Sequence, residues 1–363
     1  MVKSENQTTQ TTNPPFPAGV RFSLFTIHSS PFHTMSTVFS SLPGLEVPAD
    51  AINKSFADMW TSAAADGRPS PTGDDAKATQ INLVLHLGFG TTHDDAVAQF
   101  QTTINFSRRY PCRVVVLCPY SLDDNSTNRI RAKIYGECHL GKTKGDTRCC
   151  EFVMLAYPMS ARRYLESQVS ICLSTDLPLY YWVHRFASSR RLNDYQYLLV
   201  KSERVILDSA VMPEGFGDYA WPRPEAVRDL AHARTLPIRQ SIGQFLSACP
   251  PAGLVDGISA IRIARAPQYA AEAAALLKWA RDRLIACGMD KNTPAELTSS
   301  ADGEPPLSLN FEYKTPSRHF RWRGDPHAGT SGIDSMLCHG PMQVSVPVSL
   351  LTPEAALGEA MFF

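Results

Sequence analysis

The segment GECHLGKT, residues 136–143, has the letters of a phosphate-binding loop, G-x-x-x-x-G-K-[ST]. In such a loop the chain leaves a strand and opens a helix, so that backbone N–H groups and the lysine converge on phosphates. Here Lys142 is followed by TKGDTR and the apolar segment CEFVMLAYP, which leave no room for a helix. A hairpin turn is the favoured interpretation. The alternative is a nucleotide-binding enzyme that uses Gly136 to Thr143 together with Asp208, the acid near the end of RVILDS.

A second glycine-bearing segment, GFGTTH at residues 88–93, lies between an apolar run and a helical pattern. A dinucleotide-binding fingerprint occupies such a position, but it needs a third glycine, where His93 stands, and an acid at the tip of the next strand. That strand, CRVVVLCPY, offers no such acid. A strand-to-helix turn explains both glycines, and we expect no cofactor.

The chain has nine cysteines, and its first twenty residues lack the apolar segment of a signal peptide. This odd count predicts reduced thiols and argues against a disulfide scaffold. Cys138-His139 and Cys149-Cys150 face each other across the expected hairpin, but adjacent residues of a strand point to opposite faces and no C-x-x-C spacing is present. We therefore expect no metal site, and we take Cys149 and Cys150 as candidate redox thiols.

Composition limits the classes of partner. Thirty-five basic and thirty-five acidic residues give a formal charge of zero, so no global field attracts nucleic acid or an anionic membrane. No run approaches the roughly 18 apolar residues of a membrane span. The sequence also lacks G-x-S-x-G and H-E-x-x-H, and we expect no catalytic residue. These observations favour a cytoplasmic protein without nucleic-acid or membrane partners.

Alternating strand and helix patterns predict the fold class. Apolar, β-branched runs alternate with helical segments between 81 and 209, and the runs at 131–140 and 150–158 form a hairpin. Such a pattern predicts a mostly parallel sheet flanked by helices, with an antiparallel hairpin added. We expect an N-terminal tail over 1–46, this α/β domain over 47–210, and a smaller α+β domain over 211–363.

The predicted C-terminal domain contains one strong helix, PQYAAEAAALLKWARDRLIACG at residues 267–288. Its spacing places Leu277, Ala280, Leu284 and Cys287 on one apolar face. Two or three strands are expected between 307 and 350, followed by a short helix.

Five segments, taken in order, resemble one protein family. They are YPCRVVVLCP, STDLPLYYWV, RVILDSA, DLAHARTLPIRQSIGQF and AAALLKWARDRL, and the similarity runs from about 80 to 287. The chain is similar here to the OpcA-type assembly proteins of glucose-6-phosphate dehydrogenase, which are activating subunits of that enzyme. It departs from the family pattern at His232 and Ile238, where tryptophans are expected, and at Lys278, where a glycine is expected.

The resemblance implies a binding protein without catalytic activity of its own. Its partner would be glucose-6-phosphate dehydrogenase, which it would activate in support of the oxidative pentose phosphate pathway. Four residues are candidates for the partner interface: Trp182 and Arg185 at the end of STDLPLYYWVHR, and Arg234 and Arg239 on either side of Pro237. Tryptophan and arginine often dominate interfaces. The alternatives are plain packing for Trp182 and an internal ion pair for the two arginines of the broken helix.

Overall fold

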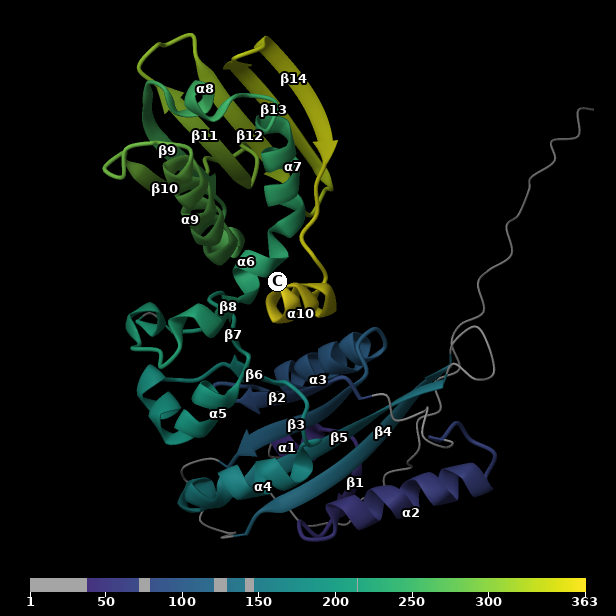
Figure 1. The fold of residues 1–363 in the computed structure, drawn as a ribbon. Helices are drawn as coiled ribbons and strands as arrows, with labels where there is room; N and C mark the ends of the chain where they lie inside the picture. Colours follow the sequence, from purple (N-terminus) through teal and green to yellow (C-terminus); the bar gives the residue numbers. More distant parts are fainter. Residues whose placement is uncertain (1–37, 72–78, 121–128, 141–146, 214) are drawn as a thin grey trace, which may run out of the picture. The chain divides into compact units, whose positions relative to one another are not determined.

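The computed structural model describes residues 38–71, 79–120, 129–140, 147–213 and 215–363. All described residues belong to one compact unit, which contains two β-sheets (Figure 1).

The first sheet has eight strands in the order β1-β4-β5-β3-β2-β6-β7-β8. These strands are β1 (Leu45–Val47), β2 (Ile81–Leu87), β3 (Cys112–Pro119), β4 (Arg131–Leu140), β5 (Thr147–Tyr157), β6 (Leu179–His184), β7 (Arg204–Leu207) and β8 (Val227–Asp229). Six of them, from β5 to β8 in the sheet order, are parallel, while β4 pairs antiparallel with β5 and β1. The predicted parallel sheet with an added hairpin is therefore confirmed.

Helices cover both faces of this sheet. Alternate residues of each central strand enter two different cores, as the two-residue period of a strand requires: Leu83 and Leu85 pack on one face, and Val84 on the other. The first core includes α1 (Val38–Ser41) and α3 (His93–Ser107). The second includes α2 (Ile52–Ala65), α4 (Leu165–Cys172) and α5 (Gln196–Lys201). Burial on both faces explains why these strands read as continuous apolar runs.

Helix α1 is tied to strand β4 by a buried lysine. The Lys133 ammonium donates hydrogen bonds to the carbonyl oxygens of Phe39 and Leu42 at 2.8 and 2.9 Å. It also lies 4.6 Å from the centre of the Phe39 ring. Phe39 and Leu42 are buried in the first core, although the sequence pattern assigned them to the tail that ends at residue 46.

The second sheet has six strands in the order β10-β9-β11-β12-β13-β14. They are β9 (Ile258–Arg265), β10 (Ala295–Ser299), β11 (Leu307–Tyr313), β12 (His319–Asp325), β13 (Thr330–Leu337) and β14 (Gly340–Pro347). Helices α7 (Leu236–Leu246) and α9 (Ala270–Ala286) pack on one face of it, in a core that contains Phe320 and Trp322. The other face carries exposed ion pairs such as Arg262 with Glu312.

The last helix, α10 (Pro353–Phe362), leaves the second sheet and packs against the first. The Leu351 N–H donates to the Arg234 carbonyl at 3.0 Å just before α10 begins. Within α10, Phe362 packs against Tyr110, with ring centres 4.7 Å apart. Residues from both ends of the chain sequence thus complete the core of the first sheet (Figure 1).

Two disulfides correct the expectation of reduced thiols. Cys138 pairs with Cys149, and Cys249 with Cys338. The first pair forms because the register of β4 and β5 places the two residues directly opposite each other, with their Cα atoms 4.0 Å apart. The second joins segments separated by 89 residues. Neither pairing can be derived from spacing, because strand register and long-range packing determine both.

Candidate functional site

The carboxyl edge of the first sheet contains its topological switch point. Strand β2 lies between β3 and β6, so the chain runs to opposite sides of β2 at this position. In open α/β sheets, ligands bind at such points, in the crevice outside the carboxyl ends of the strands. The loop 88–92 after β2 and the loop 185–188 after β6 meet here.

The two loops contact each other through backbone hydrogen bonds across this crevice. The Gly88 N–H donates to the His184 carbonyl at 2.7 Å, and the Gly90 N–H donates to the Arg185 carbonyl at 3.3 Å. A Cβ on Gly88 would lie 2.3 Å from the Arg185 carbonyl oxygen. The close approach of two backbones therefore accounts for the glycines of GFGTTH, in agreement with the predicted strand-to-helix turn.

The Asp95 carboxylate, in the first turn of α3, contacts side chains at the end of β6 and in the loop that follows it. The Asp95 carboxylate accepts from His184 Nε2 at 2.7 Å, lies 2.7 Å from Arg185 Nε, and accepts from Gln99 at 3.2 Å. Burial acts to raise the pKa of Asp95, but the hydrogen bond and charge of His184, with Gln99 and Arg185, lower it overall. Arg185 has φ 49°, a left-handed conformation that is rare for a residue with a side chain.

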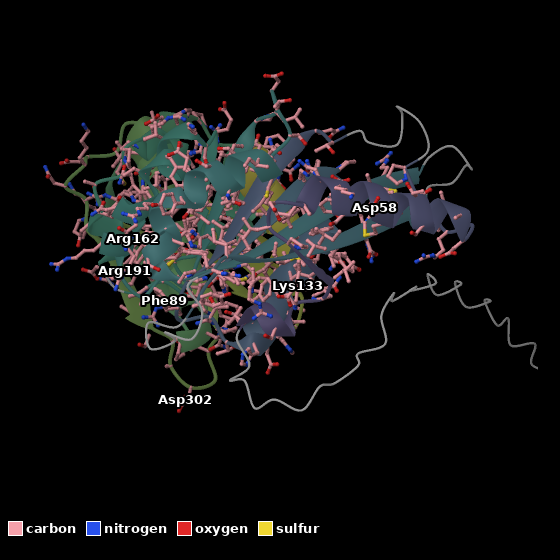
Figure 2. All side chains as sticks on the ribbon, turned by 90° about the horizontal axis from the view of Figure 1, so that it is seen from below. Asp58, Phe89, Lys133, Arg162, Arg191 and Asp302 are labelled. Atoms are coloured by element: carbon pink, nitrogen blue, oxygen red, sulfur yellow. A yellow bond between two sulfur atoms is a disulfide. The ribbon has the colours of Figure 1, made fainter. Side chains whose placement is uncertain are left out.

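The buried histidine of β2 lies beneath the same edge. His86 hydrogen-bonds to the hydroxyls of Tyr181 and Tyr157 at 2.8 and 2.7 Å, and Tyr157 reaches the Tyr195 hydroxyl at 2.7 Å. Burial lowers the pKa of His86 to about 3, so its ring is neutral near pH 7. A small hollow lies beside these residues, with Phe89 and Arg191, which are labelled in Figure 2, in its lining.

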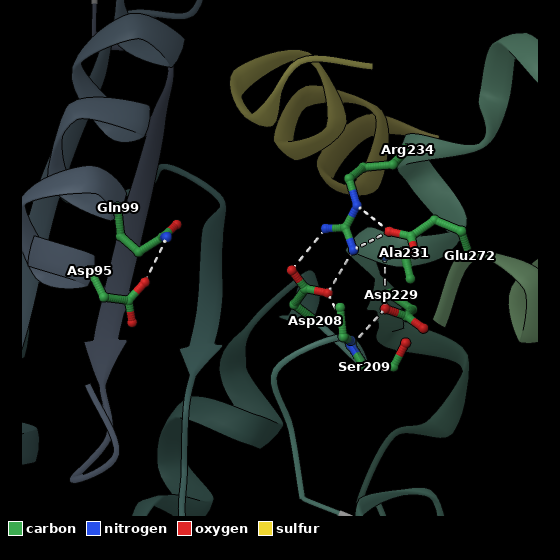
Figure 3. Close-up of polar contacts among 9 residues, drawn as sticks. Asp95, Gln99, Asp208, Ser209, Asp229, Ala231, Arg234 and Glu272 are labelled. Carbon is green, nitrogen blue, oxygen red and sulfur yellow. Dashed lines mark hydrogen bonds and ion pairs between the residues drawn. The ribbon is translucent and has the colours of Figure 1, made fainter. Parts of the chain in front are cut away.

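An ion-pair network joins the first sheet to α9 (Figure 3). Arg234, at the end of α6 (Leu230–Arg234), donates to both oxygens of Asp208 at 2.8 and 3.0 Å. It also donates to Glu272 of α9 at 2.8 Å. Burial acts to lower the pKa of Arg234, but the hydrogen bonds and charges of Asp208 and Glu272 raise it overall. Figure 3 also shows Asp229 accepting from the N–H groups of Ser209 and Ala231.

A cluster of positive charges surrounds His232 on the neighbouring turn of α6. Burial, together with the positive charges of Arg239, Lys278, Arg228 and Arg283, lowers the pKa of His232 to about 4. We call these four basic residues the cationic cluster. Its two members on α9, Lys278 and Arg283, are exposed. Lys278 pairs with Asp282, and Arg239 lies 3.8 Å from Glu359.

The four candidate interface residues differ in their exposure and contacts. Trp182 is 2% exposed and lies in the first core, so its ring packs inside the fold and does not lie on a surface. Arg185 is 38% exposed at its side chain and contacts Asp95. Arg234 and Arg239 are largely buried in ion pairs, as the alternative interpretation of these arginines held. A role of these residues in partner binding stays a prediction.

The two candidate redox cysteines differ in state. Cys149 is paired with Cys138, so it is not a thiol in this structure. Cys150 is a free, buried thiol, and a hydrogen bond from Cys112 lowers its pKa to about 7 despite burial. Its 1% exposure limits direct access to a redox partner.

The described part of GECHLGKT, residues 136–140, lies within strand β4. Gly136 lies inside β4 opposite Glu151, and a Cβ there would clash with Trp60 of α2. A phosphate-binding loop cannot begin at a residue that is paired in the middle of a strand. Lys142 and Thr143 lie outside the described residues. Asp208, the second residue of this hypothesis, pairs with Arg234.

Several features of the molecule were missed by the sequence patterns. The contact of Asp95 with His184 crosses 89 residues, and the charges around His232 come from three different elements, β8, α7 and α9. Cys249, Cys338 and His339 also lie close together. The dipeptide Cys338-His339 before Gly340 was a signal that could have drawn attention, because a glycine after two residues suits a tight hairpin turn.

No described helix has both the length and the apolar composition required to cross a membrane. The fold and these sites therefore describe an α/β protein in which buried ion pairs and an exposed group of positive charges are the prominent polar features.

Comparison with known proteins supports the family resemblance over part of the chain. Residues 103–220 match the family model described as the glucose-6-phosphate dehydrogenase subunit N-terminal domain, OpcA_G6PD_assem. The match confirms the resemblance to the OpcA-type assembly proteins over these residues, which run from within α3 to beyond β7. No curated protein and no solved structure matches the chain significantly.

Proposed function

We propose that this chain binds glucose-6-phosphate dehydrogenase and raises its activity as an assembly factor and allosteric activator, without catalysing a reaction itself. The observation that carries the proposal is the family match over residues 103–220, the segment that contains five of the eight strands of the first sheet, β3 to β7. The wider resemblance in sequence order, from about 80 to 287, supports it.

Activation of this kind requires a difference in affinity. A binding protein shifts its partner toward the active state only by as much as it binds that state more tightly than the other. Two sheets joined by buried ion pairs supply a rigid binding surface, which needs little ordering when a complex forms. The chain then needs no catalytic group of its own.

The exposed members of the cationic cluster, Lys278 and Arg283, are the proposed contacts with the partner, together with Arg185. Four positive charges lie beside a neutral histidine, and among the described residues only two acids, Asp282 and Glu359, pair with them, so we expect this region to attract carboxylates. Because the net charge of the chain is zero, attraction to an acidic surface must come from such a local cluster. Lys278 also replaces the glycine of the family pattern, so the contact here would differ in detail from that of other members.

The proposed role supports the oxidative pentose phosphate pathway, in which the dehydrogenase acts. A cytoplasmic location is part of the proposal, and it follows from the proposed partner.

Charge reversal tests the proposed interface. We expect Lys278→Glu to weaken binding to the dehydrogenase of the same genome by roughly tenfold at low salt, because it replaces an attraction by a repulsion. The matched control is Lys314→Glu, the same change at an exposed site at the end of β11 in the second sheet. Isothermal titration of the two proteins measures both affinities. Equal affinities of the two variants would contradict the assignment of this interface.

A further inference from the structure

Three side chains with metal-binding atoms converge near the end of the second sheet. The Cys249 and Cys338 sulfurs and one ring nitrogen of His339 all lie within 4.8 Å of one another. Cys249 is buried, whereas Cys338 and His339 are exposed. In the structure the two cysteines form a disulfide.

The local folds explain why the three residues meet. Cys249 lies between α7 and α8 (Pro251–Val255), where its N–H donates to the Leu246 carbonyl at 3.0 Å. Cys338 and His339 form the two-residue turn between β13 and β14, whose last pair is Leu337 with Gly340. Gly340 has φ 79°, a conformation that favours glycine.

A turn differs from a strand in where it directs adjacent side chains. Cys138 and His139 are neighbours on a strand, so they point to opposite faces of the sheet. The turn residues Cys338 and His339 are not subject to that alternation, and their donor atoms lie on the same side as Cys249. Strand alternation, which separates Cys138 from His139, therefore does not separate Cys338 from His339.

The hydrogen bond of His339 prepares its ring for a cation. His339 Nε2 donates to the Ala248 carbonyl at 2.8 Å, so the proton is on Nε2 and the lone pair is on Nδ1. Histidines that bind metals almost always donate their other ring N–H to a carbonyl or carboxylate, which fixes the ring and raises its basicity. The carbonyl here belongs to the residue that precedes Cys249.

We propose that, when the Cys249–Cys338 disulfide is reduced, the two thiolates and His339 bind one thiophilic divalent cation, with Zn²⁺ the best match. Two sulfurs and one imidazole nitrogen are ligands that zinc prefers, and water can fill the fourth tetrahedral position. In a zinc site the two sulfurs are about 3.8 Å apart, as Zn–S bonds of about 2.3 Å require. The sulfurs therefore need to separate by only about 2 Å from their bonded distance.

The proposed reaction is balanced with a dithiol reductant. The dithiol is oxidised to its own disulfide while Cys249 and Cys338 become two thiols, and Zn²⁺ then displaces the two thiol protons into solvent. Disulfide and metal site exclude each other, but either one ties the α7–α8 connection to the tip of the β13–β14 hairpin. A reducing compartment, which is part of the proposed function, would favour the metal form.

Zinc titration of the isolated chain tests the site without the dehydrogenase. The protein is reduced with tris(2-carboxyethyl)phosphine and exchanged into metal-free buffer, and Zn²⁺ is added in competition with a chromophoric chelator. A Cys138→Ser, Cys149→Ser background removes the other cysteine pair from the measurement. We expect one zinc per chain and a loss of affinity of at least tenfold in His339→Ala, which changes an exposed turn residue and leaves the cysteines intact.

The matched control is Cys287→Ser, because Cys287 is a free cysteine at the end of α9. It should bind zinc as the background protein does, and the oxidised protein should bind none. Co²⁺ gives a second readout, since thiolate ligation produces charge-transfer absorption that is absent without it. Reduced protein without bound zinc, or equal zinc affinity in His339→Ala and its background, would overturn the proposal.

Discussion

Arg234 holds acids from two different parts of the fold. Asp208 follows β7 in the first sheet, and Glu272 lies on α9 above the second. The exposed fractions of the three side chains are 18%, 14% and 6%, so little water screens the charges. Both acids depend on the same guanidinium, whose planar fork binds Asp208 through two hydrogen bonds.

Removal of this guanidinium should be costly. We expect Arg234→Met to lower the free energy of unfolding by about 3 kcal/mol or more, because two largely buried carboxylates would lose their positive counter-charge. Urea unfolding followed by circular dichroism measures the change. Arg262→Met is the matched control, since Arg262 also contacts two acids, Glu296 and Glu312, but on an exposed face, and it should change stability little. Similar losses in the two variants would contradict the buried network.

Because His86 is buried in its neutral form, we expect the folded chain to lose stability as the pH falls. Its pKa is about 3 in the folded chain and about 6.5 when unfolded, so the unfolded chain binds one more proton between these values. The stability that the neutral ring contributes is complete above pH 6.5 and is lost as pH falls toward 3. One such proton gives a slope of about 1.4 kcal/mol per pH unit.

His86→Gln keeps a hydrogen-bonding side chain that does not titrate. We therefore expect the slope of unfolding free energy between pH 4 and pH 6 to decrease by about one proton, or about 1.4 kcal/mol per pH unit. The exposed His327→Gln serves as the control and should leave the slope as it is. An unchanged slope in His86→Gln would show that this ring is not the titrating group.

At the scale of elements, the contact of the β2 and β6 loops closes the switch point. Gly88 permits it, because any side chain at this position meets the backbone of the neighbouring loop. Asp95 then fixes the β6 loop through His184 and Arg185. The position where many α/β proteins bind a cofactor is thus occupied by the protein's own chain.

Gly88→Ala should separate the two loops. We expect a loss of about 2 to 3 kcal/mol in the free energy of unfolding, because backbone atoms cannot move aside as a side chain can. Gly217→Ala is the control, since a Cβ there would meet nothing within 4 Å. Thermal unfolding of both variants tests the difference. Equal stability of Gly88→Ala and the unmodified chain would mean that the loops do not approach as described.

At the scale of the whole molecule, periodicity predicted the first sheet well. Its central strands are buried on both faces, so they appear as uninterrupted apolar runs that few other structures share. The short strands β1 and β8 have three residues each, too few to show a period. Between 307 and 350 the structure has four strands, where two or three were expected, and the last of them, β14, is a mostly exposed edge strand.

The apolar spacing of helix α9 predicted its buried face only in part. The predicted face of Leu277, Ala280, Leu284 and Cys287 shares two residues with the observed stripe, which also includes Ala273 and Leu276. Both Leu276 and Leu277 are apolar, so spacing alone could not decide which of them faces the sheet.

The sites were harder to predict than the fold. The partners of Arg234 lie 26 and 38 residues away, and Cys338 lies 89 residues from Cys249. Such contacts depend on the long-range packing of the two sheets, so a local sequence pattern cannot predict them. The family match covers residues 103–220, so it too leaves the second sheet without a functional assignment.

The central claim is that the chain activates glucose-6-phosphate dehydrogenase. The most direct measurement is the initial rate of that enzyme, from the same genome, against glucose 6-phosphate concentration, with and without a molar excess of this chain. The account predicts a lower apparent KM or a higher kcat that saturates as the chain is added. Identical rate curves, together with separate elution of the two proteins in gel filtration, would contradict it.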